Sequence, residues 1–108
     1  MKVYISGPIT GIKNGNKKAF QEAADLITKL GDTPINPHEI CKWLPKDSTW
    51  HEYMKICLIE MLKSDKVMML PGYTESEGAM MESNLAYSMQ IEVIYYQDVL
   101  YEDFKNVQ

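Results

Sequence analysis

Short apolar runs alternate along the chain with longer stretches in which apolar residues recur every three or four positions. The short runs are typical of buried β-strands, and the longer stretches are typical of helices with one apolar face. The pattern predicts four strands, at residues 2–6, 33–36, 66–70 and 92–95. It predicts four helices, at about residues 16–30, 49–62, 76–89 and 98–104. Residues 38–49 follow neither period, and we expect them to be irregular.

Capping residues set the expected ends of these helices. Asn16 and Asp98 are expected to cap the first and last helices, and Gly31 to end the first one. Thr49 followed by Glu52 has the spacing of a capping box. The apolar positions of the first two helices are expected to face the core, and the eight methionines mostly to fill it. These helix positions are Phe20, Ala23, Ala24, Ile27, Leu30, Trp50, Met54, Cys57, Leu58, Met61 and Leu62.

The alternating order of strands and helices predicts an α/β fold. A parallel sheet of four to five strands with helices on both faces satisfies this order, with right-handed crossovers. The run 66–70 is apolar almost throughout, as expected for a strand covered on both faces. Because no linker or repeat interrupts the 108 residues, we expect a single domain over 1–108.

Charge and composition narrow the classes of partner. The net charge of −4 and the pI near 5.1 argue against a surface for a nucleic acid polymer. No apolar run approaches the roughly 20 residues that cross a bilayer, and the first residues lack the core of a signal peptide. We therefore expect a cytoplasmic protein without a membrane partner. Cys41 and Cys57 have no metal-binding pattern around them, so no metal and no cofactor are expected.

Two glycine-containing segments are expected at the edge of the sheet where ligands bind. In a flavodoxin-like strand order, the switch point lies beyond the first and third strands. Residues 7–11 follow the first strand and residues 71–78 follow the third. Ser76 begins a helix there, and Gly78 lets a ligand approach free backbone N–H groups that suit an anion. Glu82, less than two turns further on, can reach the same crevice.

The same residues also have simpler interpretations, which the pattern leaves open. Ser76 can be a plain helix cap, Gly78 a close-packing position, and Glu82 an exposed charge. Gly7-Pro8 can be only a turn. The chain has neither a Walker lysine nor a GxGxxG segment, so a known ATP or dinucleotide motif is not indicated.

Aromatic and imidazole side chains add weaker candidates. Tyr4 lies on the first strand near the expected crevice, although tyrosines on strands usually belong to the core. His38 follows the second strand and can reach a ligand, whereas His51 is expected at the surface. Trp43 and Trp50 bracket a loop that can form a lid or stack on a base, and a core or subunit contact is the alternative.

Several of these segments together resemble the nucleoside 2-deoxyribosyltransferase-like superfamily, and in particular a small branch found in phages and bacteria. The resemblance covers nearly the whole chain. It is carried by Tyr4–Gly11, Asn36-Pro37, Ser64-Asp65, Leu70–Gly72, and Ser76-x-Gly78-Ala79-x-x-Glu82 followed by Ala86. It implies a flavodoxin-like, Rossmann-like fold and cleavage of the N-glycosidic bond of a 2-deoxynucleoside or its 5′-monophosphate. The deoxyribosyl group is then transferred to another base or to water.

The resemblance also implies roles for single residues. Glu82 matches the nucleophile that forms a glycosyl-enzyme intermediate, and Tyr4 matches a tyrosine that orients it. Substrate-binding roles fall on five residues, with a serine at the Ser76 position typical of the monophosphate hydrolases. These five are Gly7, Pro8, Ile9, Ser76 and Gly78. Because sites of this superfamily are often completed by a neighbouring subunit, a homo-oligomer is expected.

Cys57 departs from the superfamily pattern. Family enzymes usually have an aspartate at this position, which holds the sugar and assists protonation of the departing base. A thiol is a weak donor and neutral at its usual pKa, so Glu60 or His38 would have to supply the acid. The alternative function is therefore a non-catalytic nucleotide sensor or sequestering protein with the same crevice. A scaffold that binds no ligand is a third possibility.

Overall fold

Four parallel strands form one sheet in the order β2-β1-β3-β4. The structure is a computed structural model, and it describes residues 1–107. The strands are β1 (Lys2–Ser6), β2 (Thr33–Ile35), β3 (Lys66–Met69) and β4 (Glu92–Tyr95). In the centre of the sheet, Tyr4 of β1 lies opposite Val67 of β3. The predicted parallel α/β fold is confirmed, with the first and third strands adjacent.

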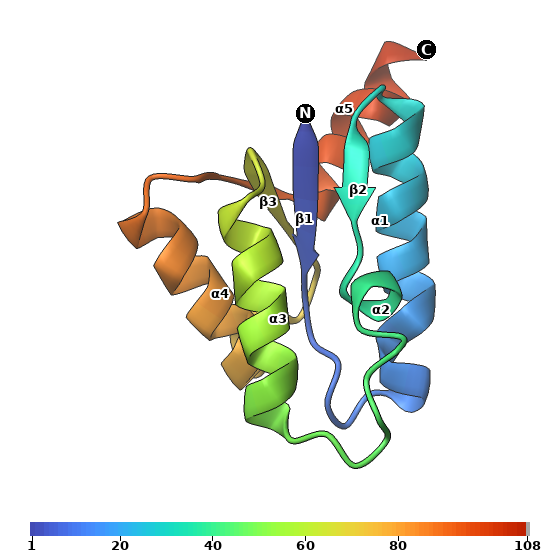
Figure 1. Cartoon of the computed structure of the whole chain (residues 1–108). Coiled ribbons are helices and arrows are strands. Elements are labelled where there is room, and N and C mark those ends of the chain that lie inside the picture. Colours follow the sequence, from blue (N-terminus) through green and yellow to red (C-terminus); the bar gives the residue numbers. More distant parts are fainter. Residues whose placement is uncertain (108) are drawn as a thin grey trace.

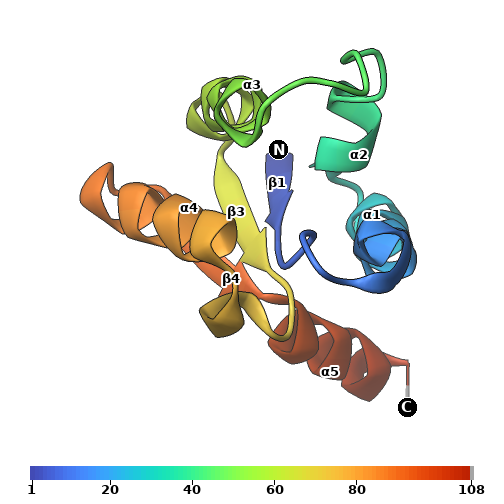
Figure 2. The same ribbon diagram turned by 90° about the horizontal axis from the view of Figure 1, so that it is seen from below.

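Helices cover both faces of this sheet (Figures 1 and 2). Helices α3 and α4 lie against one face, and α1 and α5 against the other. The helices are α1 (Lys17–Lys29), α2 (Pro37–Ile40), α3 (Trp50–Leu62), α4 (Glu77–Ser88) and α5 (Tyr96–Asn106). Two short 3₁₀ segments, η1 (Lys13–Asn16) and η2 (Tyr73–Glu75), precede α1 and α4. No helix within residues 1–107 is long and apolar enough to cross a membrane.

The two central strands divide their side chains between two apolar cores. Val3 and Ile5 of β1 point toward α1, where they pack with Phe20. Tyr4 points to the opposite face, where it packs with Cys57 and other apolar groups of α3 and α4. Since side chains alternate along a strand, Ser6 follows Tyr4 onto this second face. The chemistry described below lies on that face.

Several predicted helix ends are confirmed and two caps are wrong. The capping box of Thr49 and Glu52 is present at the start of α3, and Gly31 follows α1 with a φ of +90°. Asn16 precedes α1, but it adopts a left-handed conformation and its side chain donates to the carbonyl of Pro8 at 3.0 Å. Asp98 lies in the first turn of α5, because that helix begins two residues earlier than predicted.

The segment after β2 is more ordered than its sequence pattern indicates. We expected Asn36 to end the second strand and residues 38–49 to be irregular. Instead, the side chain of Asn36 accepts a hydrogen bond from the N–H of His38 at 3.0 Å and starts the short helix α2. Pro37 stands at its first position, where a missing N–H costs nothing. A helix of only four residues is too short to show a helical repeat of apolar positions in the sequence.

Helix α4 buries polar residues and exposes apolar ones. Glu82 and Ser83 are buried, whereas Met81, Tyr87 and Met89 are exposed. Expected core positions are also exposed at the ends of the other helices, at Leu30, Trp50 and Leu62. The expectation that the eight methionines mostly fill the core holds for only half of them: Met54, Met61, Met68 and Met69 are buried, Met80 is half-buried, and Met1, Met81 and Met89 are exposed. A buried glutamate on a helix with exposed methionines indicates a constraint other than packing.

Gly7→Ala tests how tightly the carboxyl ends of β1 and β3 pack. A Cβ at Gly7 would lie 2.8 Å from Cβ of Leu70, the residue after β3, whose backbone N–H donates to the carbonyl of Ser6 at 2.8 Å. We expect this change to lower the free energy of unfolding by about 1–3 kcal/mol, as overpacking does elsewhere. Gly78→Ala is the control, because its Cβ would have its one tight contact with the flexible thioether of Met54, at 3.3 Å. Equal stability of the two variants in urea denaturation would contradict the assignment.

Candidate active site

The carboxylate of Glu82 is held from both sides by two hydroxyl groups of β1. The phenol of Tyr4 donates to Oε2 at 2.5 Å, and the hydroxyl of Ser6 donates to Oε1 at 2.7 Å. Glu82 is 5% exposed, and both of its donors are completely buried. Because Tyr4 and Ser6 are two positions apart on one strand, they face the same side of the sheet and reach the same carboxylate.

Burial and hydrogen bonding act on Glu82 in opposite directions. Desolvation raises the pKa of Glu82 to about 6, and the hydrogen bonds from Tyr4 and Ser6 oppose that rise. None of the ion pairs among residues 1–107 includes Glu82. The pKa of Tyr4 lies well above its ordinary value because of burial and the negative charge of Glu82, so the phenol stays protonated as a donor. A pKa of about 6 leaves the carboxylate mostly ionised at neutral pH, without a countercharge among residues 1–107.

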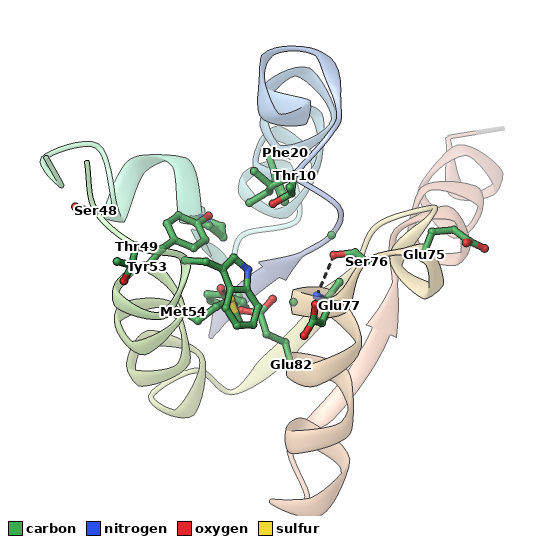
Figure 3. Close-up of a pocket in the computed structure, with 17 residues that line it drawn as sticks. Thr10, Phe20, Ser48, Thr49, Tyr53, Met54, Glu75, Ser76, Glu77 and Glu82 are labelled. Atoms are coloured by element: carbon green, nitrogen blue, oxygen red, sulfur yellow. Dashed lines mark hydrogen bonds between the residues drawn. The ribbon is translucent and has the colours of Figure 1, made fainter. Parts of the chain in front are cut away.

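Glu82 lies in the wall of a pocket of about 710 Å³, a size typical of small-molecule sites. The walls come from the loop after β1, from α1, from the segment that enters α3, and from the start of α4 (Figure 3). Seventeen residues line it. They are Tyr4, Gly7, Ile9, Thr10, Phe20, Pro37, Ser48, Thr49, Trp50, Tyr53, Met54, Glu75, Ser76, Glu77, Gly78, Ala79 and Glu82.

Six of the seven site residues expected from the sequence line this pocket. They are Tyr4, Gly7, Ile9, Ser76, Gly78 and Glu82. Pro8 is the exception: it is buried beside Gly72, and its carbonyl accepts the hydrogen bond from Asn16. The structure thus brings together two segments that are about 70 residues apart in the chain, as the switch-point argument requires.

Ser76 acts as a helix cap and also borders the pocket. Its Oγ accepts a hydrogen bond from the N–H of Ala79 at 3.2 Å, which leaves its own hydroxyl hydrogen available. Gly78 has no side chain to fill the space beside Met54 and Trp50. The pocket wall at this end therefore consists of small groups and backbone.

The charges in the pocket are all negative. Glu75, Glu77 and Glu82 line it, and the lining contains no lysine, arginine or histidine. Figure 3 shows Glu75 directed away from the other labelled side chains, so Glu77 and Glu82 face the pocket more directly. Within residues 1–107, no three carboxylate, histidine or cysteine side chains gather in a group that could hold a metal ion.

Sequence reasoning missed three hydroxyl groups of the site. Ser6 belongs to the first-strand motif but was given no role, although its spacing from Tyr4 places both on one face. Tyr53 and Ser48 line the pocket, and each has a buried oxygen without a hydrogen-bond partner among residues 1–107. An unpaired buried hydroxyl costs about 1–3 kcal/mol. The only sequence signal for Tyr53 is its position one helical turn before Cys57.

The residues considered as sources of a proton lie outside the pocket lining. Cys57 is buried with its Sγ 3.7 Å from that of Cys41, and burial raises its pKa to about 12. His38 shares a hydrogen bond of 2.7 Å with the carbonyl of Gly15, and desolvation lowers its pKa. Glu60 pairs with Lys63 at 3.5 Å. None of these three residues therefore offers an acid to the pocket, and the carboxyl groups that line it beside Glu82 are those of Glu75 in η2 and Glu77 at the start of α4.

The two tryptophans have different environments. Trp50 lines the pocket, whereas Trp43 is largely exposed and lies outside the lining. Trp50 stands at the first position of α3, so the capping box of Thr49 and Glu52 fixes the backbone that carries the indole. A lid or stacking role is therefore open to Trp50 alone of the two.

Comparison with known proteins agrees with the observed fold. A solved 2-deoxyribosyltransferase from the psychrotolerant bacterium Bacillus psychrosaccharolyticus is similar, with a TM-score of 0.71 and 18% sequence identity. The similarity covers 88% of this chain and 71% of that enzyme. At this identity the likeness establishes a nucleoside deoxyribosyltransferase-like α/β fold. No curated protein matches the sequence. A family model described as a domain of unknown function, DUF4406, matches residues 1–95, and the chain belongs to this family.

Proposed function

We propose that the protein breaks the N-glycosidic bond of a 2-deoxynucleoside, with Glu82 as the nucleophile. The observation that carries the proposal is the buried carboxylate in the pocket wall, which accepts hydrogen bonds from Tyr4 and Ser6 and takes part in no ion pair among residues 1–107. A carboxylate held in this way is oriented but not neutralised. The deoxyribosyltransferase-like fold supports the same class of reaction.

The chemistry requires one carboxylate oxygen to attack the anomeric carbon of the sugar. A bond forms between this oxygen and C1′, while the bond from C1′ to the base nitrogen breaks and its electron pair leaves with the base. A second base or water then attacks C1′ and releases the carboxylate, which gives transfer or hydrolysis. Tyr4 and Ser6 limit the rotation of the carboxylate, so that one oxygen stays directed at the substrate.

The pocket walls suit a nucleoside. The partly exposed ring of Trp50 lines the pocket, and such an aromatic surface stacks well on a heterocyclic base. Hydroxyl groups from Ser48, Tyr53 and Ser76 are available to polar atoms of a sugar. Both kinds of wall lie around the same carboxylate, which is what a substrate composed of a base and a sugar requires.

The charge of the pocket favours an uncharged nucleoside over its 5′-monophosphate. A serine at position 76 and the N-terminus of α4 can bind a phosphate, and this was the expectation from the sequence. However, the phosphate would share the pocket with Glu77 and Glu82 and would find no basic side chain in its lining. Negative charges that share one partly desolvated pocket repel each other strongly. We therefore place the free 5′-hydroxyl of a nucleoside at Ser76.

The second candidate function is nucleoside binding without turnover. It is favoured by Cys57: the resemblance implies an aspartate at this position, and here a buried thiol with a pKa raised to about 12 takes its place outside the pocket lining. Loss of a general acid typically lowers a rate by about 10²–10⁴-fold. A nucleoside that raises the melting temperature without releasing any base would support this candidate and overturn the enzymatic one.

Glu82→Gln is expected to abolish base release and to leave the fold intact or more stable. Removal of the nucleophile should lower the rate by more than about 10³-fold. The raised pKa of Glu82 means that stability present below pH 4.5 is lost as the pH rises through about 6. Glutamine avoids this loss, so unfolding at pH 8 should cost up to about 2 kcal/mol more than in the wild type.

Base release and urea denaturation measure both effects of this change. Glu102→Gln, at an exposed position of α5, is the matched control and should alter neither. Base release that persists in Glu82→Gln would exclude Glu82 as the nucleophile.

Tyr4→Phe should move the acid limb of the pH profile upward. The nucleophile must be ionised, so kcat/KM should fall about tenfold per pH unit below the pKa of Glu82, which is about 6. The hydrogen bond from Tyr4 lowers that pKa, and its removal should therefore raise the midpoint. Tyr101→Phe, on an exposed side chain of α5, is the control. A midpoint that is unchanged or lower in Tyr4→Phe would disprove the assignment.

A panel of substrates tests the preference for an uncharged nucleoside. Each 2′-deoxynucleoside and its 5′-monophosphate are compared at low ionic strength, where charge repulsion is least screened. We expect a higher kcat/KM for the nucleoside, and we expect the difference to become smaller in 1 M salt. A higher kcat/KM for the monophosphates at low salt would instead support binding of the 5′-phosphate by Ser76.

A further inference from the structure

One wall of the pocket carries two hydroxyl groups that the protein does not use itself. The segment that enters α3 contributes Ser48, Thr49, Trp50, Tyr53 and Met54 to the lining. The hydroxyl of Thr49 is occupied, because it bonds both the N–H and the carboxylate of Glu52. The oxygens of Ser48 and Tyr53 are buried and have no partner among residues 1–107.

Buried hydroxyl groups without a partner are rare in folded proteins, and where they occur in a pocket they mark a place for a ligand. Tyr53 is the stronger of the two cases. It lines the same pocket as Tyr4 and Glu82, and its hydroxyl has the Cys57 thiol and, further away, Cys41 and Glu82 as neighbours. Burial and those groups raise the pKa of Tyr53 far above its usual value. It is therefore always protonated and can both donate and accept a hydrogen bond.

The position of Tyr53 decides which part of a nucleoside it can meet. The anomeric carbon has to lie at the carboxylate of Glu82, so the sugar occupies the inner end and the base extends toward the more exposed Trp50. Figure 3 shows Tyr53 and Ser76 on opposite sides of the pocket. With the 5′-hydroxyl at Ser76, the 3′-hydroxyl is the polar group of a 2-deoxyribose that is left for the α3 wall.

We propose that Tyr53 determines sugar specificity, by forming a hydrogen bond with the 3′-hydroxyl of the 2-deoxynucleoside that lies against Glu82. The assignment rests on the proposed function. It gives the orphan phenol a partner of matching chemistry, because an alcohol also donates and accepts. A site built around such a bond discriminates against a ligand that lacks the hydroxyl, since the buried phenol is then left unpaired.

Binding of paired ligands to wild type and Tyr53→Phe tests the proposal. The probes are the four common 2′-deoxynucleosides and their 2′,3′-dideoxy analogues, titrated by calorimetry. The wild type should prefer the deoxynucleoside by about tenfold or more, and Tyr53→Phe should remove most of that preference. Tyr53→Phe should bind the deoxynucleoside more weakly than the wild type does, and it should bind the dideoxy analogue with nearly the same affinity. Tyr101→Phe is the matched control, because its side chain is exposed on α5, away from the pocket.

The stability of the free protein separates a ligand-binding hydroxyl from a structural one. Since the Tyr53 hydroxyl has only the Cys57 thiol beside it, a weak acceptor, and no hydrogen-bond partner of normal geometry among residues 1–107, Tyr53→Phe should melt at the same temperature as the wild type or higher. A clearly lower melting temperature, or equal weakening of both ligands of a pair, would overturn the proposal. A preference for the deoxynucleoside over the dideoxy analogue that survives in Tyr53→Phe would also overturn the proposal. In that case the proposed function would still stand. If none of the eight ligands binds the wild type, the proposed function itself fails and this inference fails with it.

Discussion

The buried carboxylate of Glu82, bonded to Tyr4 and Ser6, is the interaction on which the rest of the site depends. It joins α4 to β1 across more than 70 residues of chain. The bond can form only because β1 is next to β3, so that the helix after β3 passes over the end of β1. A sheet in the order of the chain would separate these elements. The strand order therefore determines the position of α4, and the position of α4 determines whether Glu82 can reach Tyr4 and Ser6.

Small side chains allow α4 to approach the sheet closely enough for this contact. Ala79 and Ala86 are buried on the face of α4 that also carries Glu82 and Ser83. Gly78 opens the pocket one turn before the carboxylate, and Gly7 leaves room for Leu70 beneath the loop. The inner face of α4 thus combines small and polar residues, and Met81 and Tyr87 lie on the outside. A hydrophobic helix face at that place would have excluded the carboxylate.

The sequence predicts the fold well because its signals are local. Strand runs, the capping box of Thr49 and Glu52, and Gly31 after α1 depend on neighbouring residues, and the structure contains all of them. The left-handed turn at Asn16 is different, because its side chain bonds the distant carbonyl of Pro8. The one-turn helix α2 leaves no measurable period.

For the candidate site, the sequence indicates the segments but not their partners. The switch-point argument and the resemblance point to Glu82, Tyr4, Ser76 and Gly78, which all line one pocket. They do not indicate Ser6 or Tyr53, because a hydroxyl acquires its role only when the tertiary structure decides what it meets. Pattern alone also treats Glu82 as an exposed helix charge, since charged residues are rarely buried.

The missing countercharge of Glu82 has a meaning beyond its pKa. If the carboxylate is the nucleophile that we propose, positive charge develops on the sugar as the bond to the base breaks. The substrate on its way to reaction would then be the cation that the protein withholds. The free protein bears the cost of an unneutralised charge, and only the transition state relieves it. Such a site stabilises the reacting sugar more than the resting one, which is the requirement for raising a rate.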